Sequence, residues 1–425
     1  MRITLSVFLL ALPLAAWAQT PQTGLDASAT RASEPTAPLT LKAALELALG
    51  ANPELSAAGR ELEALDATIT QAHVRPNPEL STLFEDTRRA TRTTTLQLNQ
   101  PIELGGKRGA RIEAAERGRD AASLELDAKR AEIRAAVTAA FFDVLVAQER
   151  LRLAQASVEL AQRATAAAAR RVTAGKVSPV EETRARVAEA GVRVEFAMAA
   201  SEMTTARRRL AATWANSSPR FERAEGDPEA LPPLPALADL NARLAASPSL
   251  LRAKIEVERR QALAKVERSR RVPDLTVSLG AKRNEELGLN QAIFGVSMPI
   301  PVFDRNQGNL LEALRRTDKA QDQLSAAGIR LFNELAVAYE RLSTARQETA
   351  SLRQDVLPGA QSALDAATRG FELGKFSFLD VLDAQRTLFQ ARAQSLRALA
   401  EAHRSAAEIE RILGDTPPAP AAVQP

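Results

Sequence analysis

The chain of 425 residues contains no cysteine and few histidines and methionines. The absence of cysteine excludes disulfides, thiolate metal sites and cysteine nucleophiles. Only two histidines occur, His73 and His403, and they lie far apart in the sequence. Four methionines, Met1 included, are too few for the series of thioethers that copper-handling proteins use. We therefore expect no catalytic residues, no metal site and no cofactor, and we expect that the protein is not an enzyme.

Aromatic residues make up only 4% of the chain, which argues against base-stacking platforms and against a large globular core. The 56 Lys and Arg residues are nearly balanced by 52 Asp and Glu residues, and the two signs are interspersed. This pattern is typical of solvated helix faces and indicates that no nucleic acid is bound. After the N-terminus, no apolar run reaches the ~20 residues that a membrane-spanning helix needs. A membrane-inserted form would therefore have to be a β-barrel.

The N-terminus has the pattern of a secretory signal peptide over residues 1–18. Arg2 gives the positive start, an apolar stretch follows, and Ala16-Trp17-Ala18 is a small-residue cleavage site. The alternative, an N-terminal membrane anchor, is less favoured because the apolar run is too short to span a bilayer. Residues 19–38 are rich in Thr, Ala, Ser and Pro, residues 415–425 are rich in Pro and Ala, and both segments are expected to be disordered.

The most informative feature that is present is an internal duplication. One series of residues has alternating spacings of four and three, and adding 198 to each number gives a second series in the same register. The two series are Ile133, Val137, Ala140, Val144, Ala147, Leu151, Ala154 and Val158, and Leu331, Leu335, Ala338, Leu342, Ala345, Thr349, Leu352 and Val356. A four-three spacing is typical of helices that supercoil around neighbours. The duplication predicts two equivalent halves in an extended architecture.

Short motifs repeat at nearly the same distance. Asn52-Pro53-Glu54-Leu55 returns as Ser247-Pro248-Ser249-Leu250, Pro78-Glu79-Leu80 as Pro273-Asp274-Leu275, Pro101-Ile102 as Pro299-Ile300, and Gly175-Lys176-Val177-Ser178 as Gly374-Lys375-Phe376-Ser377. The four offsets are 195, 195, 198 and 199, so only short insertions separate the halves. We expect a first repeat over residues 39–215, a linker over 216–235 and a second repeat over 236–414.

Each repeat is expected to contain short helices, a strand hairpin, a long helix and a returning helix. The first-repeat elements are helices from about 40 and over 53–73, strands over 79–86 and 93–104, and helices over 108–172 and 180–214. The second-repeat elements are helices over 236–246 and 249–271, strands over 274–282 and 292–302, and helices over 307–370 and 378–413. Period-two alternation supports the hairpins over 79–104 and 274–303. The fold class is therefore mostly α with a small β part.

Four short strands cannot close a membrane barrel, so several copies must pool their strands. Over about residues 39–414 the layout resembles the TolC-like outer-membrane efflux proteins. Phe371-Glu372-Leu373-Gly374, followed by residues 378–384, is similar to the tip of the family's second repeat. Val172-Thr173-Ala174-Gly175-Lys176, followed by Pro179-Val180-Glu181, is similar to the first-repeat tip.

The resemblance implies a homotrimer with an α-helical tunnel in the periplasm and a shared twelve-stranded β-barrel in outer-membrane lipid. It implies a passive channel that works with a periplasmic adaptor protein and an inner-membrane proton-driven transporter. The stretches Gln100–Arg108 and Pro299–Gly308 resemble the cobalt–zinc–cadmium resistance branch, which implies export of divalent heavy-metal cations. Two alternatives stay open: export of drugs or polypeptides through the same fold, and, less favoured, a periplasmic coiled-coil adaptor.

Asp380 and Asp383 are the candidate gate and selectivity residues. They lie three residues apart at the start of an expected helix and would share one face. In the implied trimer they would form two rings of carboxylates at the periplasmic mouth. The alternative is that they are ordinary acids at a helix N-terminus, stabilised by the helix dipole. Glu181 holds the equivalent place in the first repeat, and Arg184 corresponds by offset to Asp383, which predicts ion pairs between subunits.

The two expected tips are candidate contact sites for the adaptor. They comprise Gly175 and Lys176 in the first repeat and Gly374 and Lys375 in the second, since exposed turns at the end of a rigid scaffold are natural contact sites. The alternative is that the glycines only end the helices. Phe371 stands where the family often has a tyrosine, and its ring cannot donate the hydrogen bond of that tyrosine.

Overall fold

The computed structural model describes residues 34, 38–227, 230–373 and 375–414, all of which belong to one unit that spans residues 32–425. The expected signal peptide, the expected disordered tail and Gly374 lie outside the described residues, as does the 19–38 segment apart from Glu34 and Pro38.

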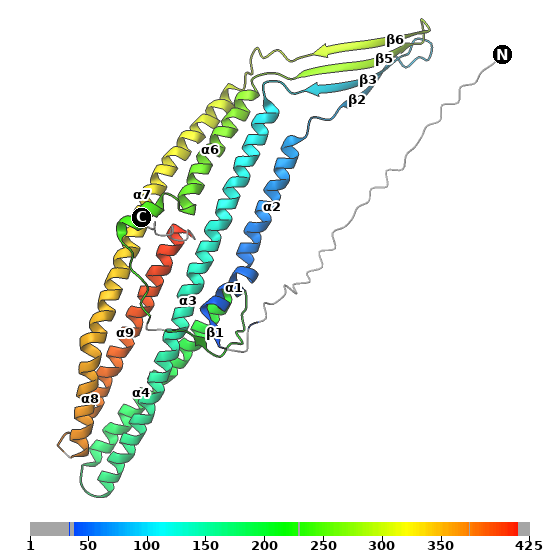
Figure 1. The fold of residues 1–425 in the computed structure, drawn as a ribbon. Coiled ribbons are helices and arrows are strands. Elements are labelled where there is room, and N and C mark those ends of the chain that lie inside the picture. The colour runs from blue at the N-terminus through cyan, green and yellow to red at the C-terminus, as the bar shows by residue number, and fades with distance from the viewer. Residues whose placement is uncertain (1–33, 35–37, 228–229, 374, 415–425) are drawn as a thin grey trace, which may run out of the picture. The chain divides into compact units, whose positions relative to one another are not determined.

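The described elements occur in the same order twice along the chain (Figure 1). The first half contains β1 (Leu39–Thr40), α1 (Leu41–Ala51), α2 (Pro53–His73), β2 (Glu79–Glu85), β3 (Thr93–Ile102), α3 (Lys107–Thr173) and α4 (Pro179–Ala212). The second half contains β4 (Ala224–Glu225), α5 (Leu237–Leu244), α6 (Pro248–Ser269), β5 (Leu275–Asn284), β6 (Leu289–Ser297), α7 (Gln307–Ser351), the π-helical turn η1 (Leu352–Val356), α8 (Leu357–Glu372) and α9 (Phe378–Leu413). None of the described helices is both long enough and apolar enough to cross a membrane.

The duplicated Asn-Pro and Ser-Pro motifs begin α2 and α6. Asn52 Oδ1 accepts hydrogen bonds from Glu54 N and Leu55 N, and Ser247 Oγ accepts one from Leu250 N. These bonds satisfy amide groups that have no partner within the helix. The proline that follows each cap occupies the first helical position, where its missing N–H leaves no bond unmade. The same chemistry therefore fixes equivalent helix starts in both halves.

The two hairpins join into one antiparallel sheet of four strands in the order β2-β3-β5-β6. Leu80, Leu98, Leu279 and Phe294 lie in one register row across all four strands, and all four are exposed. The opposite face is mostly polar and more covered. There Asn99 Nδ2 donates to Ser81 Oγ at 3.2 Å, and Ser278 Oγ donates to Asn99 Oδ1 at 2.7 Å. The sheet is thus inverted relative to a water-soluble sheet, because its apolar face is the open one.

The last expected strand is shorter than the alternation of apolar residues indicates. The pattern predicts a strand over 292–302, but β6 ends at Ser297. Pro299 and Pro301 follow, and each lacks the backbone N–H that a strand needs for its ladder. The alternation of Met298, Ile300 and Val302 therefore belongs to an exposed connection between β6 and α7.

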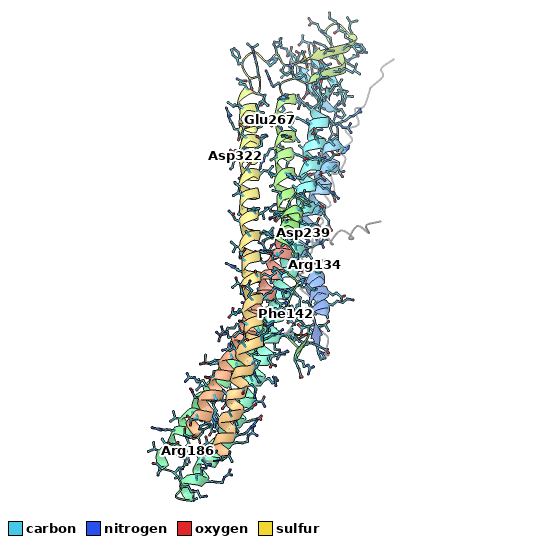
Figure 2. All side chains as sticks on the ribbon, turned by 60° about the vertical axis from the view of Figure 1, so that its left-hand side comes forward. Arg134, Phe142, Arg186, Asp239, Glu267 and Asp322 are labelled. Carbon is cyan, nitrogen blue, oxygen red and sulfur yellow. The ribbon has the colours of Figure 1, made fainter. Side chains whose placement is uncertain are left out.

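The helices lie side by side, with α3 contacting members of both halves. Nearest the sheet the order is α2-α3-α6-α7, and toward the other end α3 contacts α4 and α9 (Figure 1). Glu267 on α6 and Asp322 on α7 lie near the sheet end, and Arg186 on α4 lies near the opposite end (Figure 2). Consequently α2 and α4 lie at one edge of the helical layer, and α7 and α8 lie at the other.

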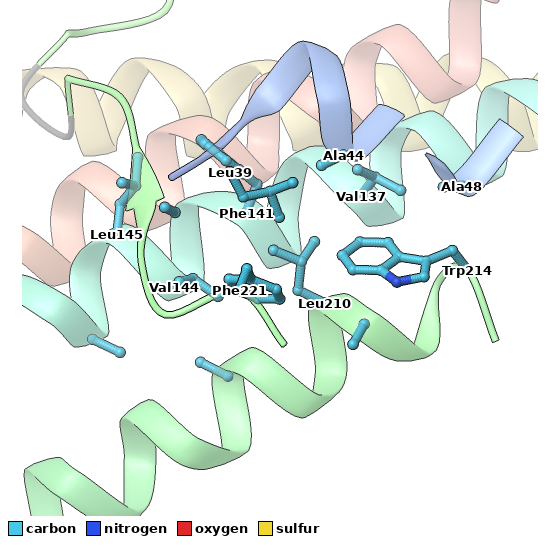
Figure 3. Close-up of a cluster of buried hydrophobic side chains, with 14 of the residues drawn as sticks. Leu39, Ala44, Ala48, Val137, Phe141, Val144, Leu145, Leu210, Trp214 and Phe221 are labelled. Atoms are coloured by element: carbon cyan, nitrogen blue, oxygen red, sulfur yellow. The ribbon is translucent and has the colours of Figure 1, made fainter. Parts of the chain in front are cut away.

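A large apolar cluster lies where the short elements cover α3 (Figure 3). Val137, Phe141 and Val144 of α3 are almost completely buried against α1, the end of α4 and the loop that carries Phe221. β1 closes the cluster by pairing in parallel with β4, with Leu39 opposite Ala224. The second half repeats this arrangement around Leu335 and Leu342 of α7. Apart from Val356, the members of the four-three series are therefore buried or half-buried in both halves.

The second series is interrupted at its last member. Val356 is expected in the buried seam but is 44% exposed, because η1 adds one residue to the helical turn before it. Leu357 N–H donates to Leu352 O, five residues earlier. Pro358, near the start of α8, has no N–H, and its ring would collide with the carbonyl four residues before it in a regular helix. A π turn absorbs this conflict and shifts the register of everything that follows.

Glu34 links the N-terminal segment to the loop after α4. Its side chain is 8% exposed and accepts hydrogen bonds from Trp214 Nε1 at 2.8 Å, from Asn216 Nδ2 and from Arg220 N. Burial opposes ionisation of this carboxyl, but the hydrogen bonds, including one from the backbone of Phe221, outweigh burial and lower the pKa of Glu34. Glu34 is therefore a charged anchor inside a segment that the sequence predicts to be disordered.

We expect Glu34→Gln to destabilise the protein by about 1–3 kcal/mol at neutral pH, because it removes a charged acceptor from buried donors. A lowered folded pKa gives stability that is present above the unfolded pKa of about 4.3 and is lost as the pH falls through the folded value. The difference in thermal unfolding between wild type and variant should therefore shrink below about pH 4. Glu46→Gln, at an exposed position on α1, is the control and should show no difference. A pH-independent difference would contradict the charged state of Glu34.

Candidate functional site

The stretch Gln100–Arg108 forms the joint between the sheet and α3. Arg111 Nη1 lies 2.6 Å from Glu103 Oε1, and Lys107 Nζ lies 2.7 Å from Asp274 Oδ1 at the start of β5. Arg111 also donates to backbone carbonyls at the end of α2. The Lys107–Asp274 pair connects the first half of the chain to the second. These residues hold the hairpins at a fixed position on the helices, and their contacts are structural.

The equivalent joint in the second half uses different chemistry. Asn306 has a left-handed backbone with φ 55°, where Gly106 has φ 74° in the first half. The Asn306 amide donates to Glu267 O and Glu267 Oε2, both at 2.8 Å. Gly105 is required on steric grounds, since a Cβ there would lie 2.7 Å from Val272 Cβ. The glycine pair and its neighbours are therefore joint residues between the sheet and α3.

The turn between α3 and α4 is closed by Gly175. Its φ is 68°, Gly175 N donates to Val172 O at 2.9 Å, and Lys176 N donates to Arg171 O at 2.9 Å. This pair of bonds is a Schellman motif, in which a left-handed residue ends a helix. In the second turn Lys375 N donates to Gly370 O at 2.8 Å, the same bond at the equivalent place. Gly175 thus has a structural role in ending α3, which is compatible with a contact role for the exposed turn.

The two turns are held together by a contact that the sequence does not predict. The Arg171 guanidinium lies 4.3 Å from the centre of the Phe371 ring, and Arg171 Nη2 donates to Phe371 O at 3.3 Å. A small apolar cluster lies beneath it, formed by Ala168, Ala185, Ala367 and Val381 from α3, α4, α8 and α9. Phe371 therefore joins the two hairpins through its ring and its carbonyl, where a tyrosine would use a hydroxyl.

Asp380 takes part in starting α9. Asp380 Oδ2 accepts hydrogen bonds from Ser377 N at 2.7 Å and from Ser377 Oγ at 2.8 Å, and Asp380 N lies 3.4 Å from Ser377 Oγ. This reciprocal arrangement is a capping box. Asp383 lies one turn later and is exposed, and its backbone carbonyl accepts the Thr387 hydroxyl. The geometry gives Asp380 a helix-capping role and leaves the Asp383 carboxylate open.

Asp380 and Asp383 line one groove, of about 610 Å³, between α9 and α4. Glu195 and Arg386 line the same groove, and neither was singled out from the sequence. Their spacing along the chain gives no signal, because only the packing of α4 and α9 on α3 brings them together.

Glu181 and Arg184 pair with each other. Arg184 Nη1 lies 3.6 Å from Glu181 Oε1 within α4, as expected for residues three apart on a helix. In the described part of this single chain Arg184 forms no ion pair with Asp380 or Asp383. The expected pairing between subunits stays a prediction.

The two histidines do not share a site. His403 on α9 is buried, and its ring stacks on Phe142 of α3 with 3.3 Å between centroids. Burial lowers the pKa of His403. His73 lies at the exposed end of α2, with Nδ1 2.9 Å from Ile69 O. Across the described residues, no three histidine, aspartate or glutamate side chains are grouped so that they could hold a metal ion.

Asp380→Ala and Asp383→Ala should separate capping from charge. We expect Asp380→Ala to weaken the first turn of α9 by about 0.5–2 kcal/mol, because it removes one half of the capping box. Asp383→Ala removes an equal charge from the next turn without removing a cap. Hydrogen exchange of the peptide that begins at Ser377 should therefore quicken only in the first variant. Equal exchange in both variants would show that the capping box contributes nothing.

Comparisons with known proteins agree with this architecture. The profile of the family described as "Outer membrane efflux protein" matches residues 44–216 and 240–415. The cobalt-zinc-cadmium resistance protein CzcC of Cupriavidus metallidurans is 54% identical over 381 residues, which cover 90% of this chain and 91% of that protein. The nickel-cobalt-cadmium resistance protein NccC of Alcaligenes xylosoxydans xylosoxydans is 29% identical over 287 residues, covering 66% of this chain and 65% of that protein.

Solved structures share the fold at low sequence identity. The crystal structure of CusC superimposes with a TM-score of 0.75 at 19% identity, covering 88% of this chain and 92% of that chain. The outer membrane protein VceC of Vibrio cholerae gives a TM-score of 0.73 at 18% identity, covering 88% and 95%. The fold is therefore that of the TolC-like channels. Since the family profile matches more than half of the sequence, in both halves, the chain belongs to the outer membrane efflux protein family.

Proposed function

We propose that this outer-membrane efflux protein acts as a homotrimeric, passive channel for divalent heavy-metal cations. The observation that carries the channel is the four-stranded sheet with an exposed apolar face, a polar opposite face and two open edges. Strand edges are not tolerated in lipid unless they are paired, so β2 and β6 need strands from other copies. Three copies would supply the twelve strands of one closed barrel, as the resemblance to TolC-like channels implies.

The helices support the same ring. Exposed apolar residues follow α4 at one edge (Val180, Val187 and Val194) and α7 at the other (Ile329, Phe332 and Val337). Because the two surfaces differ, a contact between copies would join the α4 edge of one copy to the α7 edge of the next. Contacts of this kind close into a ring when the rotation between copies allows it. In this proposal the chain divides as expected into a signal peptide, a first repeat over 39–215, a linker, and a second repeat over 236–414.

The proposed cargo rests on the relatives. CzcC, with 54% identity, is named for resistance to cobalt, zinc and cadmium, and NccC for resistance to nickel, cobalt and cadmium. We propose that this chain exports cobalt, zinc and cadmium ions, and that it performs no chemistry on them. A periplasmic adaptor and a proton-driven inner-membrane transporter would deliver the ions. The transporter would choose the cargo, and the channel would provide the route across the outer membrane.

The ends of the helical hairpins are the proposed mouth. Asp380 and Asp383 both bring a carboxylate to this mouth; that of Asp383 is open, whereas that of Asp380 also caps the helix through Ser377. Carboxylates that converge near an axis concentrate cations by focusing the field. Glu181 and Arg184 would exchange their mutual pair for contacts between subunits in the closed state.

In planar bilayers, Asp383→Ala should weaken cation selectivity more than Asp380→Asn.

The turns at Gly175-Lys176 and Gly374-Lys375 are the proposed adaptor contacts. Gly175 and Lys176 are exposed, and Lys375 is exposed beside the Arg171–Phe371 contact that holds the two turns together. A rigid, exposed pair of turns at the end of a helical scaffold suits a docking role.

Export of metal ions is tested by their content in cells. We expect a strain that lacks this gene, but keeps the proposed transporter and adaptor, to accumulate cobalt, zinc and cadmium during metal exposure. Mass spectrometry of washed cells measures this, and expression of the wild-type chain should restore the lower content. Magnesium content is the internal control and should not change. Unchanged cobalt, zinc and cadmium together with increased sensitivity to organic drugs would favour the alternative cargo class.

The lipid-facing assignment is tested on the sheet. We expect Phe294→Arg to cost about 2–4 kcal/mol if the site lies near the bilayer midplane, and less near an interface. The amount of heat-modifiable trimer in outer-membrane fractions should fall accordingly. Gln97→Arg, on the polar face of the same sheet, is the control and should assemble normally. Normal assembly of Phe294→Arg would remove the lipid-facing assignment.

A further inference from the structure

The contact between the two halves of one chain contains an ion-pair motif on α3. Arg117 Nη1 lies 2.9 Å from Asp120 Oδ2, three residues later on the same helix. The same Arg117 Nη1 lies 3.3 Å from Glu258 Oε2 on α6, in the second half of the chain. Arg117 therefore connects the first half to the second, and its side chain is 35% exposed.

The same motif recurs on α7 without its second partner. Equivalent buried residues of α3 and α7 are 198 apart. At the same offset, Arg117 and Asp120 of α3 are equivalent to Arg315 and Asp318 of α7. Arg315 Nη1 lies 3.0 Å from Asp318 Oδ2, so the intrahelical pair is reproduced. The Arg315 side chain, however, is 76% exposed, because α7 lies at the edge of the helical layer (Figure 1).

The residue equivalent to Glu258 lies on α2, at the opposite edge of the helical layer from α7. α2 begins after Asn52 and α6 begins after Ser247, so equivalent residues of these two helices are 195 apart. The residue of α2 that is equivalent to Glu258 is therefore Glu63. Glu63 is 72% exposed on α2 and has a weak contact with Arg60 at 3.5 Å. Figure 1 shows α7 and α2 on opposite sides, with α6 and α3 between them. Arg315 and Glu63 therefore cannot meet within one copy of this arrangement.

We propose that the contact between the halves of one chain is repeated between copies, so that Arg315 pairs with Glu63 of the neighbouring copy. α7 would then pack on the next α2 as α3 packs on α6. This inference rests on the proposed assembly and names the residues that align its subunits. Exposed ion pairs contribute little free energy, so the role of this pair is to select one alignment of the two helices.

The strands lead independently to the same arrangement. Within the chain, Leu98 of β3 lies opposite Leu279 of β5. At an offset of 198, Leu98 is equivalent to Val296 of β6, and at an offset of 195, Leu279 is equivalent to Phe84 of β2. β2 and β6 are the two open edge strands of the sheet. Both side chains are exposed on the apolar face. If β6 of one copy pairs with β2 of the next in the register of β3 and β5, the apolar faces of the two sheets therefore continue into each other. A closed sheet requires this continuity.

The absence of cysteine from the chain gives a direct test by cross-linking. The variant Glu63→Cys with Arg315→Cys, treated with a short bismaleimide in outer-membrane fractions, should give covalent dimers and trimers in denaturing electrophoresis. The control is Arg117→Cys with Glu258→Cys, in which both cysteines belong to one chain. Its cross-linked product should migrate as a monomer. Trimers on native electrophoresis without covalent multimers in the first variant would overturn the inference and leave the proposed channel intact.

Charge reversal tests the pair without cysteines. Arg315→Glu and Glu63→Arg should each reduce the fraction of trimer, because each places like charges across the contact, and the combined variant should recover it. Arg130→Glu is the control, since Arg130 pairs with Asp127 at 2.9 Å on α3 and lies away from both edges. Equal trimer fractions in all variants would overturn the pairing. Absence of trimer in the wild-type protein would instead refute the proposed assembly.

Discussion

The burial of one face of α3 is the contact on which the other elements depend. Val137, Phe141 and Val144 are nearly inaccessible, and they are covered by α1, α4 and the loop around Phe221. Further along, the same helix contacts α2, α6 and α9, so it is packed against both halves of the chain. Most of the stability of a protein helix comes from the packing of its apolar face rather than from intrinsic propensity, and α3 packs over much of its 67 residues. Its seam thus determines where the joint at one end and the turn at the other end can lie.

The sequence predicts the parts of this arrangement that are periodic. The four-three series finds the seams of α3 and α7 because burial along a helix repeats every three to four residues. The hairpins are found because side chains alternate across a strand. Both signals fail where a single residue changes the local geometry. Pro299 ends β6 before the apolar alternation ends, and the π turn moves Val356 out of the seam.

Contacts between side chains that are distant in sequence could not be predicted. Arg171 and Phe371 are 200 residues apart, and although the resemblance singles out Phe371, nothing in either local sequence identifies the other residue as its partner. The roles of Asp380 and Asp383 look alike in sequence, yet the hydroxyl of Ser377 engages one carboxylate and leaves the other free. Glu34 lies in a stretch whose composition predicts disorder. The burial of Glu34 could not be predicted, because composition carries no information on a single carboxylate. Candidate residues can therefore be named from sequence, while their separate roles need the packing.

The π turn also bears on how a duplicated chain can diverge. In a regular helix one added residue would rotate everything beyond it by about 100° around the helix axis, since a regular turn takes ~3.6 residues. Before η1, buried Ile133, Val137 and Val144 of α3 correspond to buried Leu331, Leu335 and Leu342 of α7, so substitutions at these positions are constrained alike in both halves. Beyond η1 the buried positions continue at an offset of 199, since Ala161 and Ala168 of α3 and the equivalent Ala360 and Ala367 of α8 are all buried. An insertion that would misplace a whole hairpin in a regular helix is thus taken up within one turn, and the two hairpins keep equivalent buried positions.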